Sequence, residues 1–157
     1  MAETLVDIIM RKVSEAAGLP HRLVVVAAAY GSSYGAGKTH ALHTVHVRTG
    51  APLINLESVL SDRMRDLTEE QRQMELPRLL GEVVGGVVGD LVLLDGAEVL
   101  FHTGLKNPLR LLRDLAKDKT IVVAWQGCVS DGHTISAPNG RRYPTRGFLV
   151  AGPEANE

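Results

Sequence analysis

A lysine and a threonine that follow two glycines give residues 32–39 the spacing of a polyphosphate-binding loop. The segment comes after the apolar run 23–29 and opens a stretch of helical character; it reads Ser32-Ser33-Tyr34-Gly35-Ala36-Gly37-Lys38-Thr39. A loop between a strand and a helix can surround a phosphate with backbone N–H groups, and the helix directs its positive end to the same place. We expect Lys38 to reach the outer phosphates and the Thr39 hydroxyl to bind Mg²⁺.

One position of this loop departs from the usual pattern. A glycine is expected five residues before the last loop glycine, and the chain has Ser32 there, with Gly31 one residue earlier. Gly35 and Gly37 remain to supply backbone freedom. A glycine-rich segment before a helix can also be no more than a turn, so the prediction needs a second feature to support it.

A carboxylate at the end of a later apolar segment is that second feature. The segment reads Asp90-Leu91-Val92-Leu93-Leu94-Asp95-Gly96-Ala97-Glu98. Mg²⁺ keeps several water ligands and needs a protein carboxylate nearby, so a buried strand that ends in Asp95 suits a phosphate loop. We expect this strand to end beside the first strand, with Thr39 and Asp95 as the metal ligands. The alternative for Asp95 is a turn residue at a strand exit.

The two motifs together predict a site for ATP and Mg²⁺. The residues expected to contact the nucleotide are Ser33, Tyr34, Gly35, Ala36, Gly37, Lys38, Thr39 and His40. The histidines at 40, 43 and 46 spread over about a third of the helix circumference, so at most two of them could share a metal ion. Zinc would need further ligands, and histidines on a helix face are the favoured interpretation.

Hydrolysis would also require a group that orients a water molecule. Glu98, three residues after Asp95, is the first candidate, and a solvated carboxylate on a turn is the alternative. Gln126 follows the apolar run 120–125 and could sense the terminal phosphate; otherwise it is a polar loop residue. The predicted catalytic residues are therefore Lys38, Glu98 and Gln126. An arginine from a neighbouring subunit often completes such sites, and none is singled out among Arg110, Arg113, Arg141, Arg142 and Arg146.

Apolar runs with strand character alternate along the chain with segments of helical spacing. Strands are predicted at 22–29, 53–56, 91–94, 120–125 and 147–150. Helices are predicted at 3–17, 38–48 and 57–67, in a short piece capped by Thr68 and Gln71, at 77–87, and from Asn107-Pro108 to Ala116. Asn139-Gly140 indicates a hairpin turn. The alternation predicts an α/β fold with a mostly parallel sheet of about five strands and helices on both faces, of the P-loop NTPase (AAA/ASCE-like) type. Ligands of such sheets bind at the carboxyl ends of the strands.

Composition limits the remaining classes of protein. The chain has 157 residues, 45% of them hydrophobic and 22% charged, which fits one domain at 1–150 and a flexible tail at 151–157. A net charge of −1 gives no global basic field that would recruit nucleic acid. The single cysteine, Cys128, excludes an internal disulfide, and no apolar run approaches the length of a membrane span. A cytoplasmic protein is the expectation.

Several segments together resemble a known protein family, the small P-loop proteins of the BREX phage-defence systems (BrxF). The resemblance covers the phosphate loop, Pro52-Leu53-Ile54-Asn55-Leu56, Leu93-Leu94-Asp95-Gly96-Ala97-Glu98-Val99-Leu100-Phe101, Pro108-Leu109-Arg110-Leu111-Leu112 and Val122-Val123-Ala124-Trp125-Gln126-Gly127. The combination of the segments at 95–101 and 124–127 is more specific than the phosphate loop. The departure at Ser32 puts rapid catalysis in doubt more than nucleotide binding.

The resemblance implies an ATP-binding subunit of a bacterial anti-phage system. We expect an ATPase whose nucleotide state sets its assembly, as a homo-oligomer or with other defence proteins. Direct contact with DNA is left open, and no membrane contact is expected. Two alternatives remain, namely a small-molecule kinase, for which 57–89 would supply the lid and acceptor region, and a nucleotide-binding scaffold without turnover.

Overall fold

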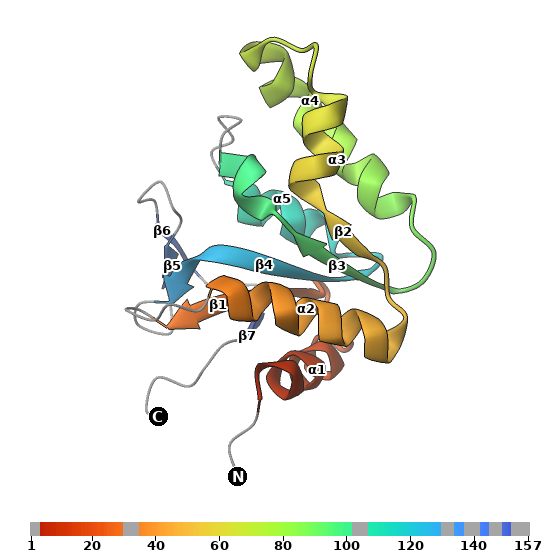
Figure 1. Cartoon of the computed structure of the whole chain (residues 1–157), viewed down its shortest axis with the longest axis vertical. Helices are drawn as coiled ribbons and strands as arrows, with labels where there is room; N and C mark the ends of the chain where they lie inside the picture. Colours follow the sequence, from red (N-terminus) through yellow and green to blue (C-terminus); the bar gives the residue numbers. More distant parts are fainter. Residues whose placement is uncertain are drawn as a thin grey trace.

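The computed structural model describes residues 4–29, 35–101, 107–129, 134–136, 142–144 and 149–151. Its centre is a parallel sheet in the order β2-β3-β4-β1-β7 (Figure 1). These strands are β1 (Leu23–Ala29), β2 (Leu53–Asn55), β3 (Leu91–Asp95), β4 (Thr120–Val129) and β7 (Leu149–Ala151). β5 (Thr134–Ser136) and β6 (Arg142–Pro144) continue from β4 as antiparallel strands. The prediction of an α/β fold with about five mostly parallel strands is confirmed.

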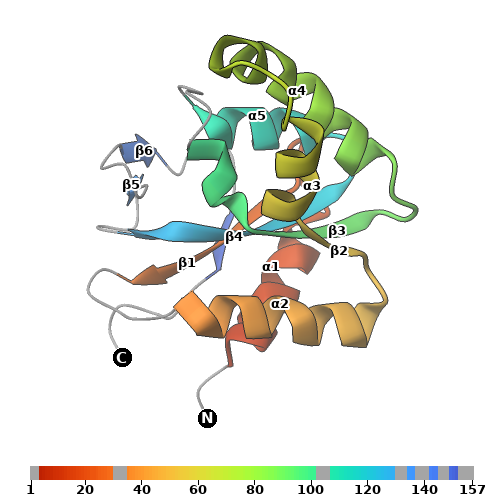
Figure 2. The same cartoon turned by 45° about the horizontal axis from the view of Figure 1, so that its top comes forward.

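Helices cover both faces of the sheet. They are α1 (Leu5–Ala16), α2 (Gly35–Thr49), α3 (Leu56–Arg63), α4 (Glu69–Gly85), the 3₁₀ helix η1 (Ala97–Phe101) and α5 (Pro108–Leu115). Figure 2 shows α1 and α2 on one side of the sheet and α3, α4 and α5 on the other. The arrangement is Rossmann-like, because a parallel sheet needs a helical layer on each face to bury its apolar strands.

Alternate residues of the strands supply the two cores. In β1, Leu23, Val25 and Ala27 are buried against the α3–α4–α5 layer. Val24 and Val26 point the other way, into the core formed with α1 and α2. Each strand residue therefore has an apolar neighbour whichever face it occupies, which explains the continuous apolar run at 23–29.

Polar caps fix the starts of two helices as the sequence predicts. The Thr68 hydroxyl accepts from the Gln71 amide at 3.1 Å, and the Thr68 amide donates to Gln71 Oε1 at 2.9 Å. Asn107 Oδ1 accepts from the Arg110 amide at 3.0 Å, and Pro108 occupies the first turn of α5. These caps satisfy backbone amides that have no partner inside the helix.

Three predicted boundaries were wrong. α4 continues through Pro77, although we expected a new helix to begin there. Proline costs about 3 kcal/mol inside a helix, and here the buried side chains Leu76, Leu79 and Leu80 hold the helix against the core on either side of it. α2 begins at Gly35 rather than at residue 38. β7 runs from Leu149 to Ala151, so it enters the range 151–157 expected to be a tail; residues 152–157 lie outside the described part.

β5 and β6 form an antiparallel pair in which Ser136 lies opposite Arg142. The predicted turn at Asn139-Gly140 falls between them and lies outside the described residues. β5 also continues the sheet, because Ile135 pairs with Val129 of β4. We call β5 and β6 the β5–β6 pair.

Gly96 has a backbone conformation that other residues rarely adopt. Its φ angle is +69°, and a Cβ there would lie 2.7 Å from Asn55 Oδ1 and 3.1 Å from the Glu57 amide nitrogen. We therefore expect Gly96→Ala to lower the free energy of unfolding by about 1–3 kcal/mol in urea denaturation. The control is Gly85→Ala at the end of α4, where nothing lies within 4 Å of the added carbon. Equal stability of the two variants would contradict the packed position assigned to Gly96.

Candidate functional site

The candidate site lies at the carboxyl ends of β1, β4 and β3, which we call the carboxyl edge. β4 lies between the other two strands, so the expectation that Asp95 lies beside the first strand is wrong. Leu94 pairs with Val123, and Val26 pairs with Ala124. Asp95 is therefore level with the Val26–Ala124 pair and two strand spacings, ~10 Å, from β1.

The first turn of α2 contributes backbone amides to this edge. Gly35, Ala36 and Gly37 are predicted loop residues that the structure places in this turn. The first four amides of a helix have no partner inside the helix, so the turn keeps the donors that a phosphate requires. The positive end of the α2 dipole adds to them. Ser33 and Tyr34, also predicted to contact the nucleotide, lie outside the described residues, as does Ser32.

Lys38 is buried at the carboxyl edge, with 3% of its surface exposed. Its Nζ donates a hydrogen bond to the backbone oxygen of Trp125 on β4. Lysine is almost never fully buried without a partner, because an ammonium loses its hydration there. The structure therefore holds a positive charge inside the protein where the strands end, with a neutral carbonyl among its partners.

The partner strand β4 is irregular at this point. Val26 pairs with Ala124 and Ala28 pairs with Cys128, so Ala27 of β1 faces three residues of β4, Trp125, Gln126 and Gly127. Such irregularities interrupt the regular ladder and are frequent near active sites. The Trp125 carbonyl that meets Lys38 belongs to this irregular stretch. β4 runs on to Val129, so Gln126 lies within the strand and not at its end as expected.

The side chain of Trp125 packs on the β5–β6 pair. Trp125 is fully buried, and its Nε1 donates to the Ser136 backbone oxygen at 2.7 Å. Its ring meets the Tyr143 ring edge to face, with centroids 6.3 Å apart and an interplanar angle of 86°. One residue thus contacts Lys38 through its carbonyl and the β5–β6 pair through its indole.

Asp95 ends β3 as predicted and is half-buried. Its Oδ1 accepts from the Gly96 amide at 2.9 Å. Asn55, at the end of β2, pairs with Asp95 across the sheet, and its Oδ1 caps α3 by accepting from the Ser58 amide at 3.1 Å. Asn55 also packs against Gly96, so it supports the turn that carries Asp95. Sequence reasoning missed this role, although Asn55 ends an apolar segment as Asp95 does.

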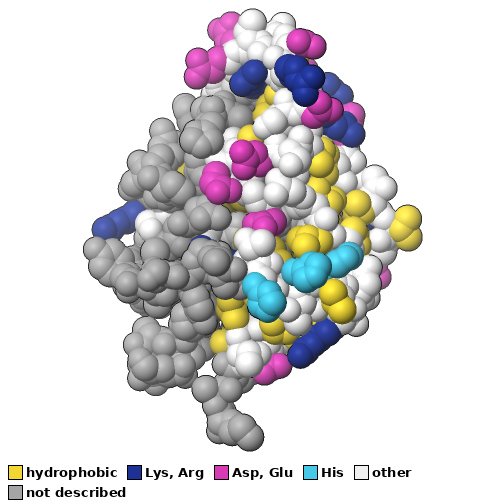
Figure 3. Space-filling model, viewed as in Figure 1, with side chains coloured by type: hydrophobic (Ala, Val, Ile, Leu, Met, Phe, Trp, Pro, Cys, Tyr) yellow, Lys and Arg dark blue, Asp and Glu magenta, His cyan; other side chains and the backbone are white. Residues whose placement is uncertain are grey.

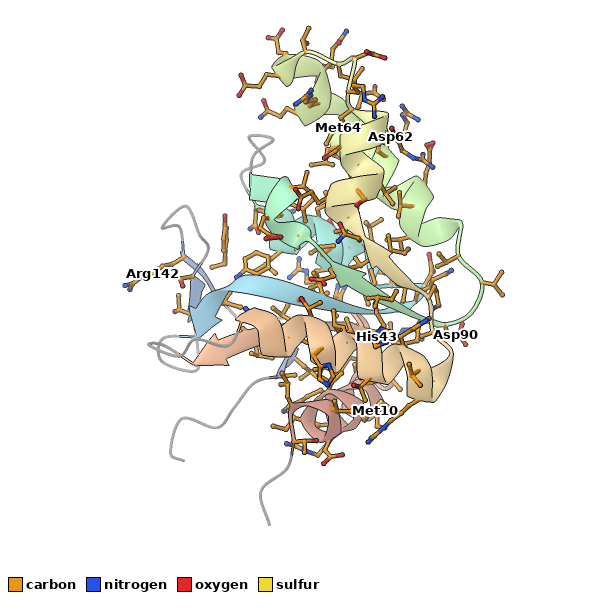
Figure 4. The ribbon with its side chains drawn as sticks, in the orientation of Figure 1. Met10, His43, Asp62, Met64, Asp90 and Arg142 are labelled. Atoms are coloured by element: carbon orange, nitrogen blue, oxygen red, sulfur yellow. The ribbon has the colours of Figure 1, made fainter. Side chains whose placement is uncertain are left out.

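Glu98 lies on η1, half-buried, in the wall of a groove of about 540 Å³. The lining residues, which define the α3–η1 groove, are Glu57, Ser61, Met64, Arg65, Arg72, Glu98 and Val99. Arg72 Nε donates to the backbone oxygens of Met64 at 3.0 Å and Leu67 at 3.2 Å, which orients its guanidinium. No ion pair joins the acidic and basic side chains that line this groove in the described part of the chain. Figure 4 labels Asp62 on α3 and Met64, the residue that directly follows this helix.

The remaining predicted residues of α2 lie on its surface. Thr39 and His40 are exposed in the first turns of the helix. His43 is exposed and His46 half-buried, and Figure 3 shows histidines gathered over α2. His46 Nδ1 lies 2.5 Å from the Ala51 oxygen, a contact that closes the far end of α2. Within the described residues, no three metal-binding side chains come together.

The arginines considered for action in trans differ in position. Arg110 is exposed on α5, whereas Arg113 is half-buried and its main-chain oxygen lies 3.1 Å from His21 Nδ1. Arg142 on β6 is exposed, and Figure 4 shows it directed away from the sheet. Arg141 and Arg146 lie outside the described residues, and the side chain of Gln126 does too.

Comparison with known proteins finds no protein-family model and no curated protein that matches the chain. No described helix is long and apolar enough to cross a bilayer.

The burial of Lys38 leads to a stability prediction. Lys38→Met keeps the apolar part of the side chain. It removes a buried charge, which is stabilising because desolvation of that charge costs several kcal/mol. It also leaves the Trp125 carbonyl without this donor, which is destabilising by about 1–3 kcal/mol. Because these effects oppose each other, we expect the free energy of unfolding in urea to fall by no more than about 1 kcal/mol. A loss of about 3 kcal/mol or more would mean that the lysine chiefly holds the fold together.

Proposed function

We propose that the carboxyl edge binds ATP with Mg²⁺ and that the protein is an ATP hydrolase of the P-loop type. The observation that carries the proposal is the buried Lys38 ammonium, held against β4 in the first turn of α2. A triphosphate would replace a neutral carbonyl with charged oxygens, which make hydrogen bonds roughly twice as strong.

The other groups at this edge supply complementary parts of such a site. The amides of the first turn of α2 would hold phosphate oxygens, and Thr39 and Asp95 would bind the metal ion, which neutralises charge on the outer phosphates. The strand order supports the AAA/ASCE-like form of the proposal, because an additional strand, β4, separates the phosphate-loop strand from the carboxylate strand. Ser33, Tyr34 and His40 remain proposed nucleotide contacts.

Glu98 and Gln126 are the proposed groups that act on the water molecule. Glu98 lies on η1, three residues after Asp95, and Gln126 belongs to β4, the strand between β1 and β3. A carboxylate can accept the proton of the attacking water, and an amide can orient it. An arginine from a second copy, such as the exposed Arg142, would stabilise charge in the transition state.

The resemblance to the small P-loop proteins of BREX systems supports a role in anti-phage defence. In that role, ATP binding would control assembly with further copies of the chain or with other defence proteins in the cytoplasm. The proposal does not include direct contact with DNA, because the net charge of −1 does not favour it.

Calorimetric titration with ATP and Mg²⁺ tests the binding site. We expect Lys38→Ala to weaken ATP binding by about tenfold to a hundredfold, the loss expected for hydrogen bonds to a charged group. Asp95→Ala should chiefly abolish the dependence of affinity on Mg²⁺. Lys119→Met is the matched control. Lys119 directly precedes β4, and its Nζ also donates to a backbone carbonyl, that of Val87. If both site variants bind ATP as the wild type does, the site is misplaced.

The α3–η1 groove favours a second candidate function, transfer of phosphate to a small molecule. A volume of about 540 Å³ is within the range of small-ligand sites. Glu98 lines the groove and follows Asp95 by three residues in the sequence. Arg65 and Arg72 could hold an anionic group of the acceptor, while Glu98 accepts the proton of its hydroxyl as that oxygen bonds to the terminal phosphorus and ADP leaves.

Phosphate release without any acceptor separates the candidates. A hydrolase releases phosphate from ATP alone, and we expect Glu98→Gln to reduce that rate by about a hundredfold. Arg72→Met changes the lining of the groove but none of the groups proposed for hydrolysis, so the rate of phosphate release should stay unchanged in this variant. A kinase would show turnover only with an added acceptor and would lose it in Arg72→Met. Binding without release under every condition would identify a scaffold.

A further inference from the structure

We propose that the β5–β6 pair responds to occupation of the phosphate site, and that Trp125 transmits the response. The inference rests on the proposed function, because it assumes that a phosphate group reaches Lys38. It adds a device that the site itself does not require, namely a second surface of the protein whose packing depends on the bound nucleotide.

The first step is the exchange of partners at Lys38. Its ammonium now donates to the Trp125 carbonyl from a buried position. Phosphate oxygens carry negative charge and accept stronger hydrogen bonds than a neutral carbonyl, so a bound triphosphate draws the ammonium toward itself. The buried carbonyl then loses a donor, which is unfavourable unless the peptide reorients toward another partner.

The second step takes place within Trp125. The carbonyl and the indole belong to one residue, and this residue lies in the stretch where three residues of β4 face Ala27 of β1. Such a stretch can change its peptide orientation with less loss of ladder hydrogen bonds than a regular strand can. A rotation of the Trp125 peptide shifts the Cα–Cβ bond from which the indole extends.

The third step is the contact with the β5–β6 pair. The indole Nε1 holds the Ser136 oxygen at 2.7 Å, and the ring packs edge to face on Tyr143. Ile135 and Tyr143 are buried in the same core cluster as Trp125. A displaced indole must therefore strain or release contacts to both strands of the pair. Arg142, next to Tyr143, is exposed and would move with it.

Trp125 is the only tryptophan of the chain, so its fluorescence reports the proposed change directly. On titration with ATP and Mg²⁺, we expect the emission to change with the same midpoint as calorimetric binding. Hydrogen exchange at the amides of residues 134–136, 142 and 143 should change at the same ATP concentration. Calorimetric binding with unchanged emission and unchanged exchange overturns the inference and leaves the proposed function standing. Absence of calorimetric binding overturns both.

Coupling between the two places also predicts a reciprocal effect. If ATP binding loosens the contact between indole and β5–β6 pair, weakening that contact makes binding easier. We expect Tyr143→Leu to tighten ATP binding by about fivefold, the low end of measured couplings. Met74→Ala is the control, because it shortens an exposed side chain on α4 that has no role in the proposed site or in the β5–β6 pair, and it should leave the affinity unchanged. Equal affinities of the wild type and Tyr143→Leu, with both proteins folded by circular dichroism, overturn the coupling.

Discussion

A positive charge buried at the carboxyl edge of a parallel sheet is the constraint on which the rest of the site depends. The Lys38 ammonium lies where hydration is largely lost, so its charge depends on the groups of the protein or of a ligand that surround it. Its contact with a backbone carbonyl satisfies a donor without neutralising the charge. The sheet supplies the burial, and α2 adds amides and a helix dipole of the same sign. A site built this way is predisposed to bind an anion before any ligand is present.

The position of β4 between β1 and β3 distributes the charges of this site over neighbouring strands. Lys38 meets β4, while Asp95 lies on the far side of β4 from β1. In the proposed site, a metal ion and phosphates would lie between the ammonium and the carboxylate and would keep the two groups from forming an ion pair with each other. The turn after Asp95 is supported by Asn55 from β2, so the edge is built from strands that are distant in sequence.

Sequence patterns were sufficient wherever local chemistry decides the structure. The apolar run at 23–29 predicted a strand covered on both faces, and the caps at Thr68 and Asn107 predicted helix starts. The patterns failed where distant contacts decide. No local feature of residues 91–94 or 120–125 predicts that β4 lies between β1 and β3. Pro77 signals a break, yet the buried leucines around it keep α4 continuous. Sequence spacing predicted a phosphate loop that contains Lys38, but not the contact of Lys38 with the Trp125 carbonyl, because the irregularity of β4 arises only on pairing with β1.

The partner of Lys38 in the nucleotide-free protein determines how binding can be communicated. An acidic partner would compete strongly with phosphate and reduce the affinity for the nucleotide. A buried ammonium without any partner would be unfavourable for folding, and it would have no contact through which binding could affect β4. The Trp125 carbonyl is neutral, so in the proposed site it would release the ammonium to a charged ligand. That carbonyl belongs to the residue whose indole donates to the Ser136 oxygen and packs on Tyr143, so in the proposed coupling its release would also affect the β5–β6 pair. The proposed coupling would draw on the penalty of a buried carbonyl that loses its donor, about 1–3 kcal/mol, which is within the coupling range of allosteric proteins. A chain of this size can thus link a ligand site to a second surface through a single buried residue.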